Sequence, residues 1–194
     1  ASASLPVTCK LRRTSDCRSR VGSTARECPN ETHCVDVVDW TAGTCHDTRE
    51  DGQYTVGYRI ITFTKPSVAN PLQPRPLETY IFYPAGPGGV SSAFDAFIDA
   101  PVYPGEAPYP ILMFSHGSCG YPAQSIFLET YLASHGFIVV APPHPGNTIG
   151  DFPNCGTPAA QAASFVERPK DITFVLDQML AANADSGSPF FGTI

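Results

Sequence analysis

One stretch of sequence limits the possible folds more than any other part of the chain. Residues 111–114 are apolar and too few for a helix, and they run into a polar, glycine-bearing loop at 116–120. A helical pattern follows, ends at Gly136, and gives way to a second buried-type strand at 137–141. This order predicts a strand–loop–helix–strand unit of a parallel sheet. Its loop is expected at the carboxyl end of the strands, where open α/β sheets bind ligands.

The flanking sequence predicts further elements of the same domain. Runs rich in β-branched and aromatic residues at 54–63 and 77–83 predict two strands that form an antiparallel edge beside the parallel core. The proline-rich segments 65–76 and 84–110 are predicted to be connections, the second with one helical turn. From Pro169, apolar residues recur with helical spacing, so a helix is expected to begin there, after a pocket-covering loop at 150–163.

Five short motifs follow one another along this part of the chain. They are DGQYTVG at 51–57, FYPA at 82–85, FSHG at 114–117, LASHGF at 132–137 and RPKD at 168–171. In these motifs the chain resembles the first half of an α/β-hydrolase, of the group that contains dienelactone hydrolases, platelet-activating-factor acetylhydrolases and bacterial cutinases. The resemblance implies an α/β fold, the N-terminal half of a mostly parallel hydrolase sheet with an antiparallel edge. It also implies a serine carboxylic ester hydrolase of esterase, lipase or polyesterase type.

In this group the catalytic serine lies in a G-x-S-x-G turn after the helix that contains Asp171, and the 194 residues contain no such turn. We therefore expect no nucleophile, acid or base in this chain, and a C-terminal fragment of the same hydrolase as the partner that carries them. Cleavage in the polar segment 183–192 would produce such a fragment. The alternative is a non-catalytic binding or scaffold protein built on a hydrolase-like half domain.

The resemblance also assigns a role to the loop after the first parallel strand. The backbone N–H of Ser118 corresponds to an oxyanion-hole donor, and His116 and Gly117 are expected to shape the loop. Three neighbouring side chains are predicted to bind substrate: Cys119, Tyr121 and His144.

Each of these three side chains has a second interpretation. A disulfide from Cys119 to Cys155 or to the N-terminal segment is favoured over a nucleophilic thiol. Tyr121 lines the acyl pocket or packs at the helix start. His144 braces its loop or lines the pocket wall, since the base of this group follows the nucleophile along the chain.

Other polar residues near this edge are expected to have structural roles. Ser115 and His116 do not form a catalytic dyad, because adjacent side chains at a strand end point to opposite sides. The resemblance gives Arg168 and Asp171 the role of linking the helix start to a neighbouring loop. His135 is expected to cap the preceding helix.

Cysteine spacing indicates a separate N-terminal module at residues 1–47, with the hydrolase-like part at 48–194. Five of the seven cysteines fall within 37 residues there, in polar sequence that cannot build its own core. Disulfides are favoured over zinc, because no Cys-x-x-Cys pair occurs. An oxidising compartment follows, so we expect a secreted or periplasmic protein.

Composition excludes other classes of function. The net charge of −6 argues against a nucleic-acid partner, and no apolar run approaches the roughly 18 residues of a membrane span. We expect an ester as substrate, and neither a cofactor nor a metal, since serine hydrolases of this type need none.

Overall fold

The computed structural model describes residues 34–35, 46–47 and 51–194, and the chain divides into two compact units, Ala1–Asp51 and Gly52–Ile194. The described part of the first unit is an antiparallel pair, β1 (Cys34–Val35) and β2 (His46–Asp47). The side chains of the five N-terminal cysteines lie outside the described residues. The disulfide-rich module and the boundary after residue 47 therefore stay predictions.

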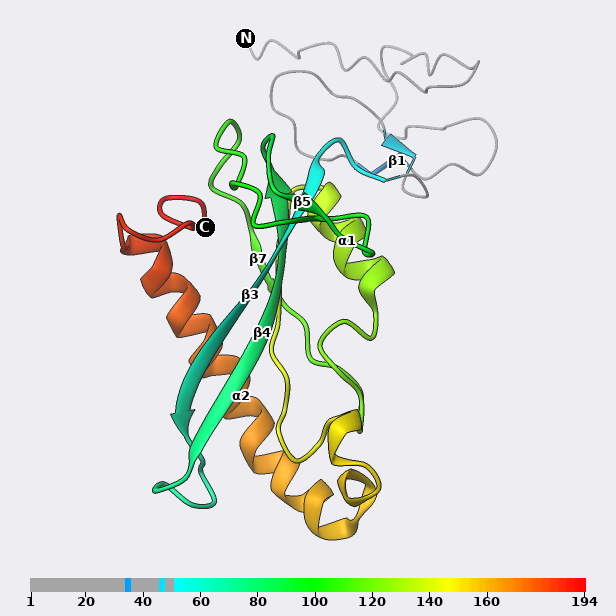
Figure 1. Cartoon of the computed structure of the whole chain (residues 1–194), viewed down its shortest axis with the longest axis vertical. Helices are drawn as coiled ribbons and strands as arrows, with labels where there is room; N and C mark the ends of the chain where they lie inside the picture. The colour runs from blue at the N-terminus through cyan, green and yellow to red at the C-terminus, as the bar shows by residue number, and fades with distance from the viewer. Residues whose placement is uncertain (1–33, 36–45, 48–50) are drawn as a thin grey trace, which may run out of the picture. The chain divides into compact units, whose positions relative to one another are not determined.

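A mixed sheet of six strands forms the centre of the second unit, in the order β5-β6-β3-β4-β8-β7 (Figure 1). The strands are β3 (Thr55–Pro66), β4 (Pro74–Ala85), β5 (Val90–Ser91), β6 (Phe97–Ile98), β7 (Ile111–Met113) and β8 (Ile138–Ala141). Strands β7 and β8 run parallel, and β4 pairs antiparallel with both β8 and β3. This arrangement is part of an α/β-hydrolase sheet, and it confirms the predicted fold class.

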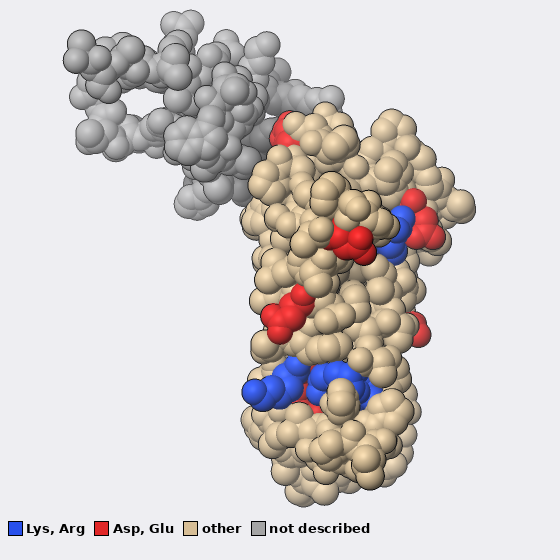
Figure 2. Space-filling view, turned by 90° about the vertical axis from the view of Figure 1, so that its left-hand side faces the viewer, with Lys and Arg blue, Asp and Glu red and all other residues tan. Residues whose placement is uncertain are grey.

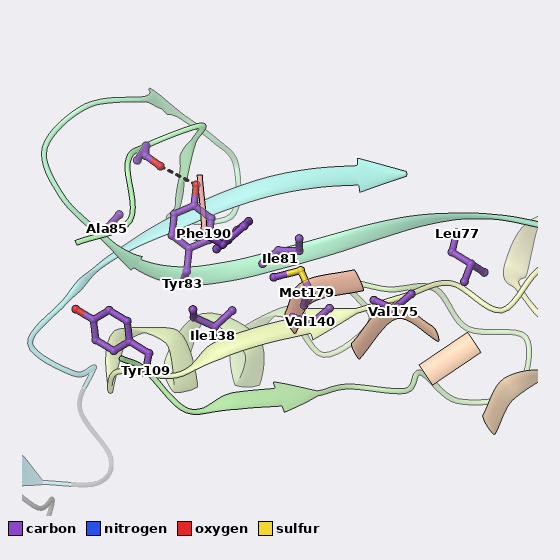
Figure 3. Packing of buried hydrophobic residues seen from close by; sticks show 11 residues of the cluster. Leu77, Ile81, Tyr83, Ala85, Tyr109, Ile138, Val140, Val175, Met179 and Phe190 are labelled. Atoms are coloured by element: carbon purple, nitrogen blue, oxygen red, sulfur yellow. Dashed lines mark hydrogen bonds between the residues drawn. The ribbon is translucent and has the colours of Figure 1, made fainter. Parts of the chain in front are cut away.

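Helices α1 (Ile126–Ser134) and α2 (Pro158–Ala184) cover opposite faces of this sheet (Figure 1). Because strand side chains alternate between faces, Ile81 and Tyr83 of β4 pack with Val175 of α2, while Phe82 packs with Ala133 of α1. Figure 3 shows the cluster on the α2 side. Both faces of the central strands are therefore buried. None of the described helices is long and apolar enough to cross a membrane.

Helix α2 begins earlier than the sequence predicts. It starts at Pro158, with the Thr157 hydroxyl accepting a hydrogen bond from the N–H of Ala160, and Pro169 lies inside it. The segment 150–163 is therefore no loop, but contains the 3₁₀ helices η1 (Ile149–Asp151) and η2 (Asn154–Gly156) and the start of α2. The prediction was wrong because the alanine-rich residues 159–163 favour a helix, and tertiary packing outweighs the one hydrogen bond that an interior proline removes.

Two predicted connections also contain more regular structure than expected. Strands β3 and β4 form one long hairpin whose turn is 67–73, and the prolines that suggested a longer connection lie at the strand ends, Pro66 opposite Pro74. The segment 84–110 contains β5 and β6 instead of a helical turn. Gly88 and Gly89, with φ of 130° and 79°, allow the bend that leads into β5.

Helix α1 buries one carboxyl group against the sheet. Glu129 is fully buried, and neither oxygen has a hydrogen-bond partner among the described residues. Burial raises the pKa of Glu129 from 4.5 to about 8. Between these values the folded state binds more protons than the unfolded state, so the free energy of unfolding falls as the pH rises.

Replacing this carboxyl by an amide removes the pH-dependent cost. We expect Glu129→Gln to match the wild type near pH 5 and to exceed its free energy of unfolding by about 1–3 kcal/mol near pH 9. Urea unfolding followed by circular dichroism at both pH values measures the difference. A difference that does not grow with pH would contradict the burial of an ionisable Glu129.

Candidate active site

The candidate site lies at the carboxyl ends of the two parallel strands. Ser115 follows β7 and His144 follows β8, and because these strands are parallel neighbours, both residues lie at the same edge of the sheet. Helix α2 adds Arg168 and Asp171 to this edge. The sequence-predicted loop and His144 are thus brought together, with two further side chains whose place in the site was not predicted.

The loop after β7 is held by hydrogen bonds on both sides of Ser118. The Gly117 N–H donates to Gln124 Oε1 at 3.0 Å, and the Gly120 N–H donates to the Gly117 carbonyl at 3.0 Å. The N–H of Ser118 itself has no acceptor within residues 51–194. The N–H groups of Ser115, His116 and Cys119 likewise have no acceptor within residues 51–194, so the fixed loop presents several uncommitted backbone donors, and the family resemblance assigns the oxyanion role to Ser118.

A disulfide and two amide side chains fix the far side of this loop. Cys119 is bonded to Cys155, which confirms the predicted disulfide of Cys119. The Ser118 hydroxyl accepts hydrogen bonds from Gln161 at 2.7 Å and from Asn147 at 3.3 Å. The same two amides donate to the Cys155 carbonyl, so the disulfide and the amides form one clamp on the loop.

His116 holds the near side of the loop through two hydrogen bonds. Its Nε2 accepts a hydrogen bond from the His144 N–H at 3.1 Å, so Nδ1 carries the proton and donates to the Gly117 carbonyl at 2.8 Å. Burial lowers the pKa of His116 to about 4, although the bond to Gly117 opposes this shift. The ring is therefore neutral at physiological pH and links the loops after β7 and β8.

Three side chains form a hydrogen-bonded chain that the sequence analysis missed. His144 Nδ1 lies 3.0 Å from Asp171 Oδ2, and His144 Nε2 lies 3.0 Å from Ser115 Oγ. Because an ionised carboxylate only accepts hydrogen bonds, Nδ1–H donates to Asp171 and Nε2 accepts from the Ser115 hydroxyl. Burial lowers the pKa of His144, so this ring is also neutral.

A buried ion-pair cluster supports Asp171 from behind. Arg75 Nη2 lies 2.8 Å from Asp171 Oδ2, and Lys65 Nζ lies 3.1 Å from Asp171 Oδ1 and 3.1 Å from Glu167 Oε2. Burial alone would raise the pKa of Asp171, but hydrogen bonds with His144 and Arg75 hold it below its usual value. On the face drawn in Figure 2, most of the visible Lys and Arg atoms lie across the lower part of the domain, and a smaller basic group lies beside acidic atoms at its upper right edge.

The substrate-binding roles expected for Cys119, Tyr121 and His144 stay predictions, and the three side chains differ in exposure. Tyr121 is exposed next to the loop, and Cys119 is partly exposed in its disulfide. His144 is fully buried, which favours the bracing interpretation over substrate contact. Within the described residues, no group of three or more His, Cys, Asp or Glu side chains is arranged to hold a metal.

Comparisons with known proteins agree with this geometry at the level of the superfamily. Residues 90–151 match the model of the Chlorophyllase family, which is a family of α/β-hydrolases. A solved ferulic acid esterase from Streptomyces cinnamoneus is similar at 20% identity and a TM-score of 0.45, over 50% of this chain and 35% of that chain. The present chain thus spans well under two thirds of that esterase. No curated protein matches the chain.

The family match contains the unit on which the sequence prediction rests. Residues 90–151 include β7, the loop, α1 and β8. In the sheet, β4 lies beside β8 and β3 lies beside β4. The match over residues 90–151 supports the assignment to the α/β-hydrolase superfamily that the motifs indicate. The narrower group within the superfamily stays a prediction.

Removing the clamp disulfide is expected to destabilise the domain. The bond joins residues 36 apart, so Cys119→Ala/Cys155→Ala should lose about 3–4 kcal/mol of unfolding free energy through the entropy of the unfolded chain. Thermal unfolding followed by circular dichroism measures this loss. An unchanged midpoint in the double variant would show that the disulfide does not stabilise the fold.

The buried histidine of the loop is expected to titrate far below its usual range. A pH titration followed by ¹⁵N NMR of the imidazole nitrogens should give a pKa of about 4 for His116, with the proton on Nδ1 in the neutral ring. A solvent-exposed histidine has a pKa near 6.5. A His116 pKa close to that value would therefore contradict the burial of its ring.

Proposed function

We propose that this chain is the oxyanion-loop half of a serine carboxylic ester hydrolase. The observation that carries the proposal is the Ser118 N–H, which has no acceptor within residues 51–194, while bonds and a disulfide fix the loop around it. The family match over this loop supports the reaction class.

Ester hydrolysis needs such a donor because negative charge develops on the carbonyl oxygen of the tetrahedral intermediate. Preorganised N–H groups stabilise that charge without reorganising during the reaction, and loss of one donor typically costs about 10²–10³ in rate. Ser118 supplies one donor in this proposal. The second is the N–H that follows the nucleophile.

The outer edge of β7, which pairs with no strand among the described residues, is the proposed docking place for the strand that leads to the nucleophile. Strand β7 ends the sheet order and pairs with β8 on one side, and its three side chains are half-buried. On α2, the large apolar side chains Phe165 and Leu180 are exposed. An open strand edge and exposed apolar side chains favour a partner, and the proposed partner is the C-terminal part of the same hydrolase, with nucleophile, acid and base.

The proposal also includes the substrate class, the absence of a cofactor and the location of the protein. The substrate is a carboxylic ester whose acyl group lies near Tyr121 and Cys119, and the chemistry needs no cofactor. The Cys119–Cys155 disulfide supports a secreted or periplasmic location, because such bonds persist in oxidising compartments.

Removing the Ser118 N–H tests the proposal. In the complete protein, Ser118→Pro should lower kcat for a p-nitrophenyl ester by about 10²–10³, because proline has no N–H to donate to the oxyanion. Ser118→Ala is the matched control. It keeps the N–H and loses only the hydroxyl that Gln161 and Asn147 hold, so its loss should be far smaller.

Steady-state kinetics and thermal unfolding of both variants separate catalysis from folding. Equal activity of Ser118→Pro and Ser118→Ala, with both folded, would contradict the oxyanion role. Absence of esterase activity in the complete wild-type protein would contradict the reaction class and favour a binding or scaffold function.

A further inference from the structure

The hydrogen-bonded chain Ser115–His144–Asp171 has the connectivity of a catalytic triad. Both donor–acceptor distances are 3.0 Å, Asp171 and His144 are fully buried, and Ser115 is exposed. In a triad, the carboxylate stabilises the imidazolium that forms when histidine accepts the serine proton. Whether Ser115 acts as a nucleophile therefore depends on the charges around His144.

Those charges oppose an imidazolium at His144. Arg75 binds both Asp171 oxygens, with Nε at 2.9 Å from Oδ1 and Nη2 at 2.8 Å from Oδ2, and Lys65 adds a second cation. Arg168 Nη2 lies 2.8 Å from Ser115 Oγ and occupies a lone pair of the hydroxyl. Glu167 shares these two cations with Asp171, so the four charges balance, and Arg168 remains as an additional cation near Ser115. Burial of His144 and this extra cation make proton transfer to His144 unfavourable.

The same contacts let Ser115, His144 and Asp171 connect the buried ion-pair cluster rigidly to the loops after β7 and β8. The hydrogen-bonded chain starts at the ion-pair cluster between β3, β4 and α2, passes through His144 into the loop after β8, and reaches the end of β7 at Ser115. Arg168 adds hydrogen bonds to the His116 carbonyl and to Asn147, and the latter also holds the Ser118 hydroxyl. Each of these hydrogen bonds joins a helix or strand, or a loop directly next to one, so the loop around Ser118 is held by the framework of the domain.

We propose that Ser115, His144 and Asp171 form a positioning relay that aims the Ser118 N–H at the oxyanion. The relay fixes the loop at residues 115–117, and the Cys119–Cys155 disulfide fixes it on the other side of Ser118. This inference rests on the proposed function for its purpose. Its structural half, the immobilisation of Ser118, is measurable in the complete protein without substrate or turnover.

NMR relaxation of the complete protein, ¹⁵N-labelled, tests that half. In the wild type the Ser118 amide should have an order parameter of about 0.85, and in Ser115→Ala it should fall to about 0.6 or below. Ser115→Thr keeps the hydroxyl and should restore the wild-type value. Ser92→Ala removes a comparable serine that bonds Ala96 at the opposite end of β3, and should leave Ser118 unchanged.

Kinetics of the complete enzyme test the catalytic half. Ser115→Ala should lower kcat by about 10–100-fold with KM unchanged, because a donor misplaced by about 1 Å costs this order of rate. Binding of a boronic acid transition-state analogue should weaken by the same factor, which a general loss of stability would not produce. Ser115→Thr should recover both.

The two halves fail in different ways. If the complete protein hydrolyses no ester, the proposed function fails while the NMR result still supports or rejects the relay. If the Ser118 order parameter is unchanged in Ser115→Ala, the relay is wrong. If a fluorophosphonate labels Ser115, that residue is a nucleophile and the positioning role is wrong.

Discussion

The Asp171 carboxylate, buried between Arg75 and Lys65, is the interaction on which the rest of the described domain depends. It joins α2 to the long β3–β4 hairpin and orients His144 in the loop after β8. Removing one partner of such a buried pair typically costs about 3–5 kcal/mol, because the other charge remains buried and uncompensated. The same carboxylate thus supports both the packing of the domain and the geometry of the candidate site.

Much of the fold follows from local sequence. The apolar run at 111–114 and the Gly136 stop predict β7, α1 and β8, since a buried parallel strand and a helix C-terminus have strong local signals. The start of α2 and the length of the β3–β4 hairpin were not predictable in this way. In both places the local rule makes proline the end of an element. Packing instead keeps Pro169 inside α2, and it keeps Pro66 and Pro74 at the paired ends of β3 and β4.

The candidate site was predictable only in part. Ser118, His116 and Gly117 came from a motif resemblance confined to one loop, and the Cys119 disulfide from the redox argument. The contacts of His144 with Ser115 and with Asp171 join three segments of the chain, so no local pattern contains them. The one signal for the Ser115–His144 contact is the strand topology. Strands β7 and β8 pair in parallel, with Met113 opposite Val140, so Ser115 after β7 and His144 after β8 lie at the same edge of the sheet.

A crystal structure of the complete protein with a bound alkyl boronic acid would test the oxyanion role of this loop most directly. Our account predicts that boron is bonded to the nucleophilic serine of the proposed C-terminal part. One boronate oxygen should then lie about 2.7–3.1 Å from the Ser118 backbone nitrogen. A boronate oxygen directed away from Ser118, or boron bonded to Ser115, would contradict the account.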